Sequence, residues 1–329
     1  MSKLSFEIGI LLISFIISII LGTIIIPMLK KLKVGQIERD DGPASHLKKQ
    51  GTPTMGGIII IITMIISVIG AYIYLLITGR VEVARNLVPL LLLTIGFGAI
   101  GFIDDYKKLV LKNTEGLKPS YKMLGLLVIS VAYVLFLTQG LEIGTDTYIP
   151  ILKTYITLPN YIYVPAAIIV ILATTNAINL TDGVDGLSSS VSSIIITGLT
   201  VIGIRMGIPE VSIFGSIVIG ATIGFLMFNL HPARVFMGDT GSLLLGGVVS
   251  GLALYLKMPL LLLIIALIPV LETLSVIIQV AYFKKTGKRF FKMAPLHHHF
   301  ELSGWKESKV VIIFSFVTLL LCIVGLKVI

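Results

Sequence analysis

The sequence predicts an all-α polytopic membrane protein with ten transmembrane helices, arranged as one integral membrane domain over residues 1–329. Composition is the first observation behind this prediction: 56% of the residues are hydrophobic, only 13% are charged, and the mean hydropathy is +1.02. Soluble globular domains carry about 25% charged residues. The second observation is a series of ten apolar runs, and the third is the distribution of lysine and arginine among the loops.

The ten apolar runs set the expected helices. A helix that crosses the hydrocarbon core needs about 20 predominantly apolar residues, and helices satisfy their own backbone hydrogen bonds inside a bilayer. The runs cover residues 8–28, 55–77, 87–103, 121–138, 161–175, 188–206, 211–228, 242–256, 260–283 and 310–328. The fifth and the eighth are short and end in polar residues.

Basic residues gather in alternate loops, which sets the expected orientation. These loops are 30–53, 104–120, 176–187, 229–241 and 284–307. With Lys122 and Lys309 at their edges, they hold 19 of the 26 lysines and arginines. By the positive-inside rule this face is cytoplasmic and both termini are extracytoplasmic. The positive flank of the first run lies on its C-terminal side, so we expect a retained anchor and not a cleaved signal peptide.

A short β-hairpin is expected in the loop 139–160, the only long loop on the outer face. Apolar and polar residues alternate there around Tyr148 and Tyr155. A period of two residues is typical of a strand.

Two adjacent carboxylates, Asp104 and Asp105, stand where the third run gives way to a basic loop. Acids are unfavourable at a helix C-terminus, where the macrodipole is already negative, and near a membrane they need a polar or positive partner. Lys107, Lys108 and Lys112 follow and can hold the pair ionised. A solvated helix end is the alternative, but the pattern favours the centre of an active site on the cytoplasmic face.

Polar side chains recur every three residues at Asn176, Asn179, Asp182 and Asp185. They line one stripe if the fifth helix continues into the loop. The acids lack the alternate spacing of a calcium loop, and no glutamate stands at its twelfth position. A polar turn is the alternative. Amides and carboxylates in a row favour recognition of a base and a sugar.

Asp239 lies between two glycines in the stretch 236–242 (FMGDTGS), just before a helix of small residues. An ordinary N-cap at Asp239 or Thr240 is the alternative. A carboxylate held there also suits Mg²⁺, which binds through one or two carboxylates and accepts substrate phosphates. Asn229 and His231 precede it in the same loop.

Three consecutive histidines, His297, His298 and His299, follow a group of basic residues in the loop 284–307. A zinc site is an alternative, but neither helical i, i+4 spacing nor a cysteine partner is present. An interfacial cluster is another. Histidines beside lysine and arginine favour a surface that binds a pyrophosphate.

Glu272 lies near the middle of the ninth run, where an ionisable residue is a functional candidate by default. Gln279 is seven residues further and projects from the same helix face. Together they predict a polar stripe that leads towards the cytoplasmic site and contributes to substrate binding. A hydrogen bond between helices is the alternative.

Five stretches, in order over nearly the whole chain, resemble the phospho-N-acetylmuramoyl-pentapeptide transferases (MraY), a branch of the polyprenyl-phosphate N-acetylhexosamine-1-phosphate transferases. They are GTPTMGG at 51–57, DD at 104–105, NLTDGVDG at 179–186, FMGDTGS at 236–242 and PLHHHFE at 295–301. The resemblance implies a multi-pass protein of the bacterial plasma membrane that moves phospho-MurNAc-pentapeptide from UDP-MurNAc-pentapeptide to undecaprenyl phosphate. It also implies release of UMP, formation of lipid I, a Mg²⁺ requirement, a homodimer and no nucleic-acid partner.

The resemblance also assigns residues. It makes Asp239 the Mg²⁺ ligand and makes Asp104 and Asp105 the catalytic pair. Positions similar to the family's nucleoside pocket are Lys49, Asn176, Asn179, Asp182, Asp185, Asn229 and Phe236. Positions that match the surroundings of the phosphates are Lys108, Lys112, Lys122, His297 and His298, and the two histidines are also catalytic candidates.

The chemistry of the acceptor constrains the mechanism that the resemblance implies. A phosphate monoester has a second pKa of about 6, so it is mostly dianionic at neutral pH and needs no obligatory general base. Two anions must meet, which makes neutralisation of charge more important than proton removal. We therefore expect direct in-line attack, with a covalent aspartyl-phosphate intermediate as the alternative.

Two other functions share part of this pattern. A transporter also has many spans and an intramembrane acid such as Glu272, but it usually shows internal repeats, and none is visible here. A relative that transfers GlcNAc-1-phosphate would share the paired aspartates and the metal site. The histidine stretch 295–301 argues against that relative.

Overall fold

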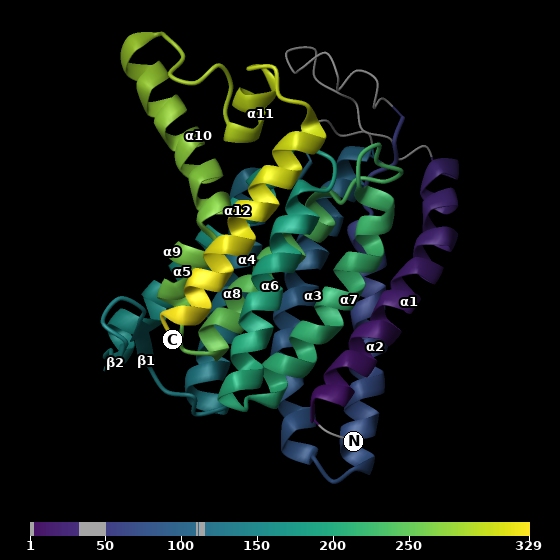
Figure 1. The fold of residues 1–329 in the computed structure, drawn as a ribbon, viewed down its shortest axis with the longest axis vertical. Helices are drawn as coiled ribbons and strands as arrows, with labels where there is room; N and C mark the ends of the chain where they lie inside the picture. The colour runs from purple at the N-terminus through teal and green to yellow at the C-terminus, as the bar shows by residue number, and fades with distance from the viewer. Residues whose placement is uncertain (1–2, 33–50, 110, 112–115) are drawn as a thin grey trace.

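The computed structural model of the protein describes residues 3–32, 51–109, 111 and 116–329, and within them the chain forms a bundle of long helices (Figure 1). The long helices are α1 (Lys3–Lys31), α2 (Gly57–Ile77), α3 (Val81–Leu109), α4 (Pro119–Leu135), α5 (Asn160–Thr181), α6 (Leu187–Met206), α7 (Pro209–Asn229), α8 (Gly238–Tyr255), α10 (Leu267–Thr286) and α12 (Glu307–Lys327). The shorter elements are η2 (Phe136–Gly140), η3 (Pro259–Leu261), α9 (Leu262–Ile265), α11 (Leu296–Glu301) and the strands β1 (Asp146–Ile149) and β2 (Thr154–Thr157).

Nine of the described helices are long and apolar enough to cross a membrane, which agrees with a polytopic membrane protein whose spans are helices. The helix that covers the eighth predicted run, α8, is not one of the nine. Its first turns contain Asp239, Thr240 and Ser242, and glycines follow along the helix. These residues lower its hydropathy.

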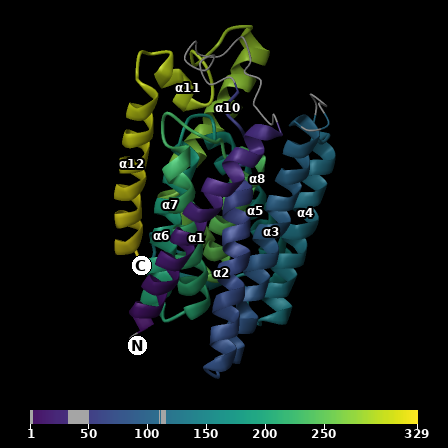
Figure 2. The same ribbon diagram turned by 90° about the vertical axis from the view of Figure 1, so that its right-hand side faces the viewer.

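The helix α8 lies inside the bundle, and every residue from Thr240 to Tyr255 is buried. It packs against α2, α3, α5 and α6, so protein surrounds it and not lipid. A helix in that position can carry polar and small residues because neighbouring helices take the place of the hydrocarbon. Figure 2 shows α1, α2, α3 and α4 as one row of long helices on the outside of this core.

The ninth predicted run is not one continuous helix. It is divided into η3, α9 and α10, with a break at Ala266, whose φ is −105° and ψ is 26°. Pro269 explains the break, because it has no N–H to donate to the carbonyl of Ile265 and its ring crowds that carbonyl. Beyond the break α10 leans away from the bundle (Figure 1).

Two helices extend further than their apolar runs. The third run ends at 103, but α3 continues to Leu109 and so carries Asp104 and Asp105 in its last turns. The fifth run ends at 175, but α5 continues to Thr181. Hydropathy alone placed these ends too early, because the last turns of both helices are polar.

The β-hairpin predicted in the loop 139–160 is confirmed. Its strands are antiparallel, with Tyr148 opposite Tyr155. The hairpin packs over the ends of two long helices: the Tyr148 N–H donates to the Lys257 carbonyl (2.8 Å), and its hydroxyl donates to the Val328 carbonyl (2.6 Å). The hairpin, the start of α1 and the C-terminus lie in the lower half of Figure 1, away from α11.

A close approach between α3 and the start of α8 positions the polar end of the bundle. Gly101 lies one turn before Asp104, and a Cβ atom at Gly101 would overlap the backbone carbonyl of Asp239. Only glycine allows the two backbones to lie this close.

We predict that Gly101→Ala lowers the thermal stability of the detergent-solubilised protein, by about 1–3 kcal/mol, because overpacking at a backbone contact forces the two helices apart. Gly70→Ala is the matched control, since Gly70 is also inside a helix and a Cβ there meets nothing within 4 Å. The control should be neutral or stabilising. Equal unfolding temperatures for the two variants would contradict the close approach.

Candidate active site

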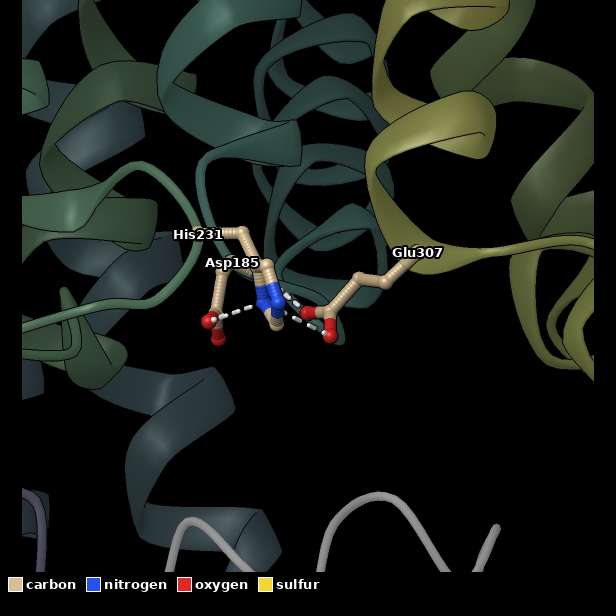
Figure 3. A group of neighbouring side chains, drawn as sticks. All are labelled: Asp185, His231 and Glu307. Carbon is tan, nitrogen blue, oxygen red and sulfur yellow. Dashed lines mark hydrogen bonds and ion pairs between the residues drawn. The ribbon is translucent and has the colours of Figure 1, made fainter.

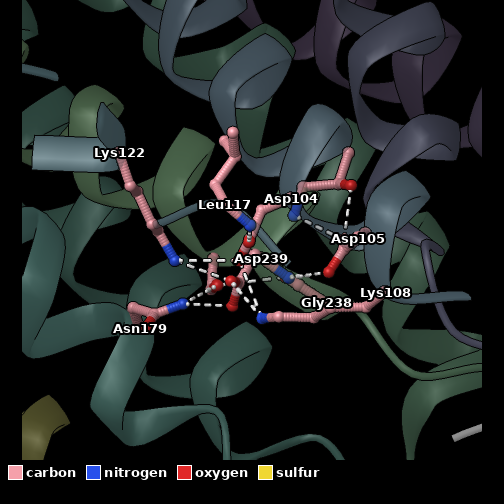
Figure 4. A network of polar contacts seen from close by, with 10 residues as sticks. Asp104, Asp105, Lys108, Leu117, Lys122, Asn179, Gly238 and Asp239 are labelled. Carbon is pink, nitrogen blue, oxygen red and sulfur yellow. Dashed lines mark hydrogen bonds and ion pairs between the residues drawn. The ribbon is translucent and has the colours of Figure 1, made fainter. Parts of the chain in front are cut away.

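Two carboxylates and two ammonium groups form the centre of the polar end (Figure 4). Asp104 Oδ2 lies 2.7 Å from Lys108 Nζ and 3.4 Å from Lys122 Nζ. Asp239 Oδ2 lies 2.6 Å from Lys122 Nζ and 3.3 Å from Lys108 Nζ. Each carboxylate therefore faces both lysines. We call these four residues the charge network.

The helix ends explain how the charge network forms. Because α3 continues past the paired aspartates, Lys108 stands four residues after Asp104 on the same helix face. Lys122 comes from the first turns of α4 and Asp239 from the first turn of α8. The backbone N–H of Leu117 donates to Asp104 Oδ1 (2.7 Å), which fixes the other oxygen of that carboxylate.

Asp105 points away from its neighbour and caps the N-terminus of α8. It accepts hydrogen bonds from the Asp239 N–H (3.2 Å), the Thr240 N–H (2.9 Å) and the Thr240 hydroxyl (2.6 Å). Free N–H groups and the positive end of the macrodipole make a helix N-terminus a favourable place for a carboxylate. Asp105 thus fixes the backbone of Asp239, whose side chain belongs to the charge network.

The two asparagines predicted on α5 lie differently. Asn179 reaches the charge network: its Nδ2 donates to Asp239 Oδ1 (2.8 Å) and to the Ser242 hydroxyl (2.8 Å). Asn176 donates to the carbonyl of Leu172 in its own helix (2.7 Å). The helix α5 therefore continues past both asparagines but ends before Asp182, so the predicted stripe does not extend along one helix to Asp182 and Asp185.

Asp182 is the C-cap of α5, and its backbone N–H donates to the Asn179 carbonyl (3.2 Å). Burial raises the pKa of its carboxyl to about 8, and the negative charges of Asp239, Asp105 and Asp185 act in the same direction. The group therefore keeps its proton at neutral pH and can donate a hydrogen bond.

His297 lies under the turn that follows Asp182. It is 1% exposed, and a Cβ atom at Gly183 would overlap its Nε2. Its backbone N–H donates to Glu272 Oε1 (3.2 Å), and its Nδ1 lies 3.3 Å from Glu272 Oε2. Glu272, which is fully buried on α10, thus holds the backbone of His297 in place.

The other residues of the histidine loop organise the loop itself. His298 Nδ1 lies 2.9 Å from Glu301 Oε2, and His299 Nδ1 accepts the Lys292 N–H at 3.2 Å. Gln279 Oε1 accepts the backbone N–H groups of Phe290 (3.1 Å) and Phe291 (2.9 Å). The side chain of Gln279 therefore holds the start of this loop, and its predicted role in substrate binding stays a prediction.

The stretch 51–57 meets the stretch 236–242 through the backbone. Phe236 N–H donates to the Pro53 carbonyl, and Gly56 N–H donates to the Phe236 carbonyl, both at 2.8 Å. Asn229 is buried and holds the same loop, because its Nδ2 donates to the Val235 carbonyl (3.0 Å) and its Oδ1 accepts the Ser189 hydroxyl (2.7 Å). The five stretches singled out in the sequence therefore lie at one end of the bundle.

Sequence reasoning missed several members of this end. Thr240 was considered only as an N-cap and Ser242 only as part of the stretch 236–242, and their contacts with Asp105 and Asn179 require the folded bundle. Glu307 stands in the first turn of α12, where an acid is ordinary, so the sequence gives no signal for it. Lys49 and Lys112, which were predicted to bind substrate, lie outside the described residues.

The chain matches known families over most of its length. Residues 87–257 match the model of glycosyl transferase family 4, and residues 49–61 match signature 1 of the phospho-N-acetylmuramoyl-pentapeptide-transferases. A phospho-N-acetylmuramoyl-pentapeptide-transferase of Acetivibrio thermocellus is 48% identical over 325 residues, which cover 98% of this chain and 95% of the relative. A relative of the same name from Clostridium botulinum is 49% identical (96% and 94% covered), and one from Caldicellulosiruptor bescii is 45% identical (97% and 96% covered).

We predict that Asp182→Asn reduces the pH dependence of stability between about pH 5 and 8, measured without divalent cations. The folded carboxyl keeps its proton up to about pH 8, whereas the unfolded one ionises near 3.8. The unfolded state therefore binds fewer protons in this window, and stability falls as pH rises, by at most about 1.4 kcal/mol per pH unit from this group. The asparagine variant should lose this contribution to the slope.

Asp146→Asn is the control for this experiment. Hydrogen bonds from Lys257 and Thr157 lower the pKa of Asp146, so its contribution to stability disappears only as pH falls through values below 3.8. Its replacement should leave the slope between pH 5 and 8 unchanged. An identical slope in wild type and Asp182→Asn would contradict the protonated state of Asp182.

Proposed function

The chain belongs to the phospho-N-acetylmuramoyl-pentapeptide transferases, and from that premise we propose that it transfers phospho-MurNAc-pentapeptide from UDP-MurNAc-pentapeptide to undecaprenyl phosphate. The products are lipid I and UMP. This reaction is the first membrane step of peptidoglycan synthesis. The same premise makes the protein a multi-pass membrane transferase.

The charge network is the observation that supports this proposal most directly. Both substrates carry their reacting groups as phosphates, so the site must bring two anions together. Lys108 and Lys122 both lie within hydrogen-bonding reach of Asp104 and Asp239, and the Asp239 side chain is 19% exposed. Because the ammonium groups are already held in place, they can neutralise phosphate oxygens without a further loss of side-chain entropy.

We propose direct transfer as the mechanism. An oxygen of the lipid phosphate attacks the phosphorus that bears the sugar, and the bond from that phosphorus to the bridging oxygen of UDP breaks, so that UMP leaves with that oxygen. The lipid phosphate is already mostly dianionic at neutral pH, so no residue needs to remove its proton. Lys108 and Lys122 stabilise the charge that develops on the equatorial and leaving oxygens.

Asp104 acts through the lysines in this scheme. Its Oδ2 holds the ammonium of Lys108 at 2.7 Å, while its Oδ1 is occupied by the Leu117 N–H. A carboxylate with both oxygens engaged is oriented to position cations and is poorly placed as a nucleophile. His297 and His298 remain candidates for contacts with the phosphates.

We propose Mg²⁺ as the cofactor and Asp239 as its protein ligand. The residues present fit the ion, because Asp239 offers a carboxylate on a side chain that is 19% exposed and that already attracts two cationic groups. Such an ion, when bound, supplies neutralisation of the transferred phosphate. Asn179 would keep the Asp239 carboxylate in one orientation.

The finer points of topology are part of the proposal. We infer that α8 is a tenth crossing, since its 18 residues lie inside the bundle that the nine apolar helices of the described residues form. The distribution of basic residues supports a cytoplasmic site with both termini outside the bacterial plasma membrane. We also propose the homodimer that the family resemblance implies, which light scattering of the detergent-solubilised protein would test.

We predict that the purified protein, with undecaprenyl phosphate and Mg²⁺, forms lipid-linked product and UMP from UDP-MurNAc-pentapeptide and not from UDP-GlcNAc. Asp239→Asn should lower this rate at least 10²-fold, because a neutral amide would hold Mg²⁺ poorly and the neutralisation that the ion supplies to the phosphates would be lost. Removal of divalent cations with a chelator should abolish turnover, and Mg²⁺ should restore it. Product can be measured by chromatography of labelled lipid.

Asp146→Asn is the control, since Asp146 lies on the β-hairpin at the other end of the bundle and should leave the rate unchanged. Transfer from UDP-GlcNAc would contradict the proposed donor. Full activity in the presence of the chelator would contradict the proposed cofactor.

A further inference from the structure

A second polar cluster lies beside the charge network and has no role in the scheme above. Asp185, His231 and Glu307 come from three separate segments: the turn between α5 and α6, the loop between α7 and α8, and the first turn of α12. Figure 3 shows the imidazole of His231 between the two carboxylates. The cluster therefore ties three parts of the chain together.

The contacts of this cluster form a clasp around Asp185. The Asp185 backbone N–H donates to Glu307 Oε1 at 2.6 Å. His231 Nδ1 lies 3.1 Å from Asp185 Oδ2 and 3.3 Å from Glu307 Oε2. The Ala233 N–H also donates to Asp185 Oδ2, at 3.0 Å. Glu307 thus holds the backbone of Asp185 with one oxygen and faces His231 with the other.

Because the contact between Glu307 and the backbone is buried, its loss would be costly. Asp185 is 3% exposed and Glu307 is 8% exposed. A buried N–H that loses its acceptor keeps its full desolvation cost, because water cannot replace the partner. The ligand-type atoms of the three residues lie within 4.8 Å of one another, as in a cation site. However, Asp185 Oδ2 is already engaged by a backbone N–H and an imidazole, which is the arrangement of a structural clasp.

The clasp acts on the turn that carries Asp182 and Asp185. Within this turn the backbone makes few bonds of its own, such as Leu187 N–H to the Val184 carbonyl (3.1 Å). Gly186 leaves the turn with φ +77°, a conformation that favours glycine. His297 supports the turn at Gly183, and Glu307 supports it at Asp185. In each of these two contacts a histidine lies beside a buried glutamate: His297 beside Glu272 on α10, and His231 beside Glu307 on α12.

We infer that Glu307 is a positioning residue for the donor nucleotide, an inference that rests on the proposed function. It fixes the backbone of Asp185, and with it the carboxyl groups of Asp182 and Asp185, in the orientation that recognises the nucleoside diphosphate sugar. Glu307 does not contact the donor itself. The contacts described above join the clasp to the turn that carries Asp182 and Asp185, and the lipid phosphate is placed at the charge network, so we expect the effect in donor binding.

The test compares Glu307→Ala and Glu307→Gln in steady-state assays with UDP-MurNAc-pentapeptide and undecaprenyl phosphate varied in turn. The alanine variant should raise KM for the donor at least tenfold, because it removes a hydrogen bond to a charged acceptor. Its KM for the lipid phosphate and its kcat should stay within threefold of wild type. The glutamine variant should stay within threefold in all three constants, since its amide oxygen still accepts the Asp185 N–H.

Glu210→Ala is the matched control. Glu210 also stands in the first turn of a helix, is also 8% exposed, and accepts a hydrogen bond from Asn86 (3.4 Å), but it belongs to α7 at the end remote from the site. Its loss should lower the unfolding temperature without a change in donor KM. A folded Glu307→Ala protein with an unchanged donor KM, or an equal loss in the alanine and glutamine variants, would overturn the inference.

A second variant and a binding measurement distinguish failure of the inference about Glu307 from misfolding and from failure of the proposed function. If Glu307→Ala does not survive purification, Glu307→Asp takes its place, because the shorter side chain withdraws the acceptor while it keeps the charge. A wild-type protein that forms no product from the muramoyl donor would contradict the proposed function and not the clasp. The clasp would then be tested by calorimetry with UMP alone, where wild type should bind at least tenfold more tightly than Glu307→Ala, and equal affinities would overturn it.

Discussion

The ion pairs shared by Asp104, Lys108, Lys122 and Asp239 are the interaction on which the polar end of this bundle depends. They join α3, α4 and α8 at the end of the bundle where Asp105 also bonds the first turn of α8. Loss of one member of such a group leaves each opposite charge with one partner fewer in a partly buried setting, which is costly. The network therefore keeps the site assembled before substrate arrives, and it presents cationic groups to anionic substrates.

The adjacent aspartates have different surroundings because they are neighbours on a helix. Successive residues point about 100° apart around the helix axis, so Asp104 and Asp105 cannot face the same partner. Asp104 meets the lysines, whereas Asp105 meets the N-terminus of α8. One carboxylate thus organises charge and the other anchors the helix that carries Asp239. A motif of two identical residues supplies two distinct functions through helix geometry alone.

Much of this could be predicted from the sequence, since the apolar runs, the hairpin around Tyr148 and the clustering of the acidic stretches follow from hydropathy and charge. The ends of α3 and α5 could not, because their last turns are polar and bonded to other helices. The break at Ala266 was not predicted, since the run 260–283 was expected to be one helix although it contains Pro269. The role of Glu307 and the bond from Thr240 to Asp105 could not be predicted, because both arise from contacts with residues far away in the chain.

The central claim is that the network neutralises charge in a direct transfer and that no aspartate becomes phosphorylated. The measurement that tests it most directly is a rapid-quench incubation of the enzyme with Mg²⁺ and UDP-MurNAc-pentapeptide, labelled at the sugar-linked phosphate, without undecaprenyl phosphate. The account predicts no label on the protein and no burst of UMP until the lipid is added. A burst of UMP equal to the enzyme concentration, with label on the chain that Asp104→Asn or Asp105→Asn removes, would contradict it.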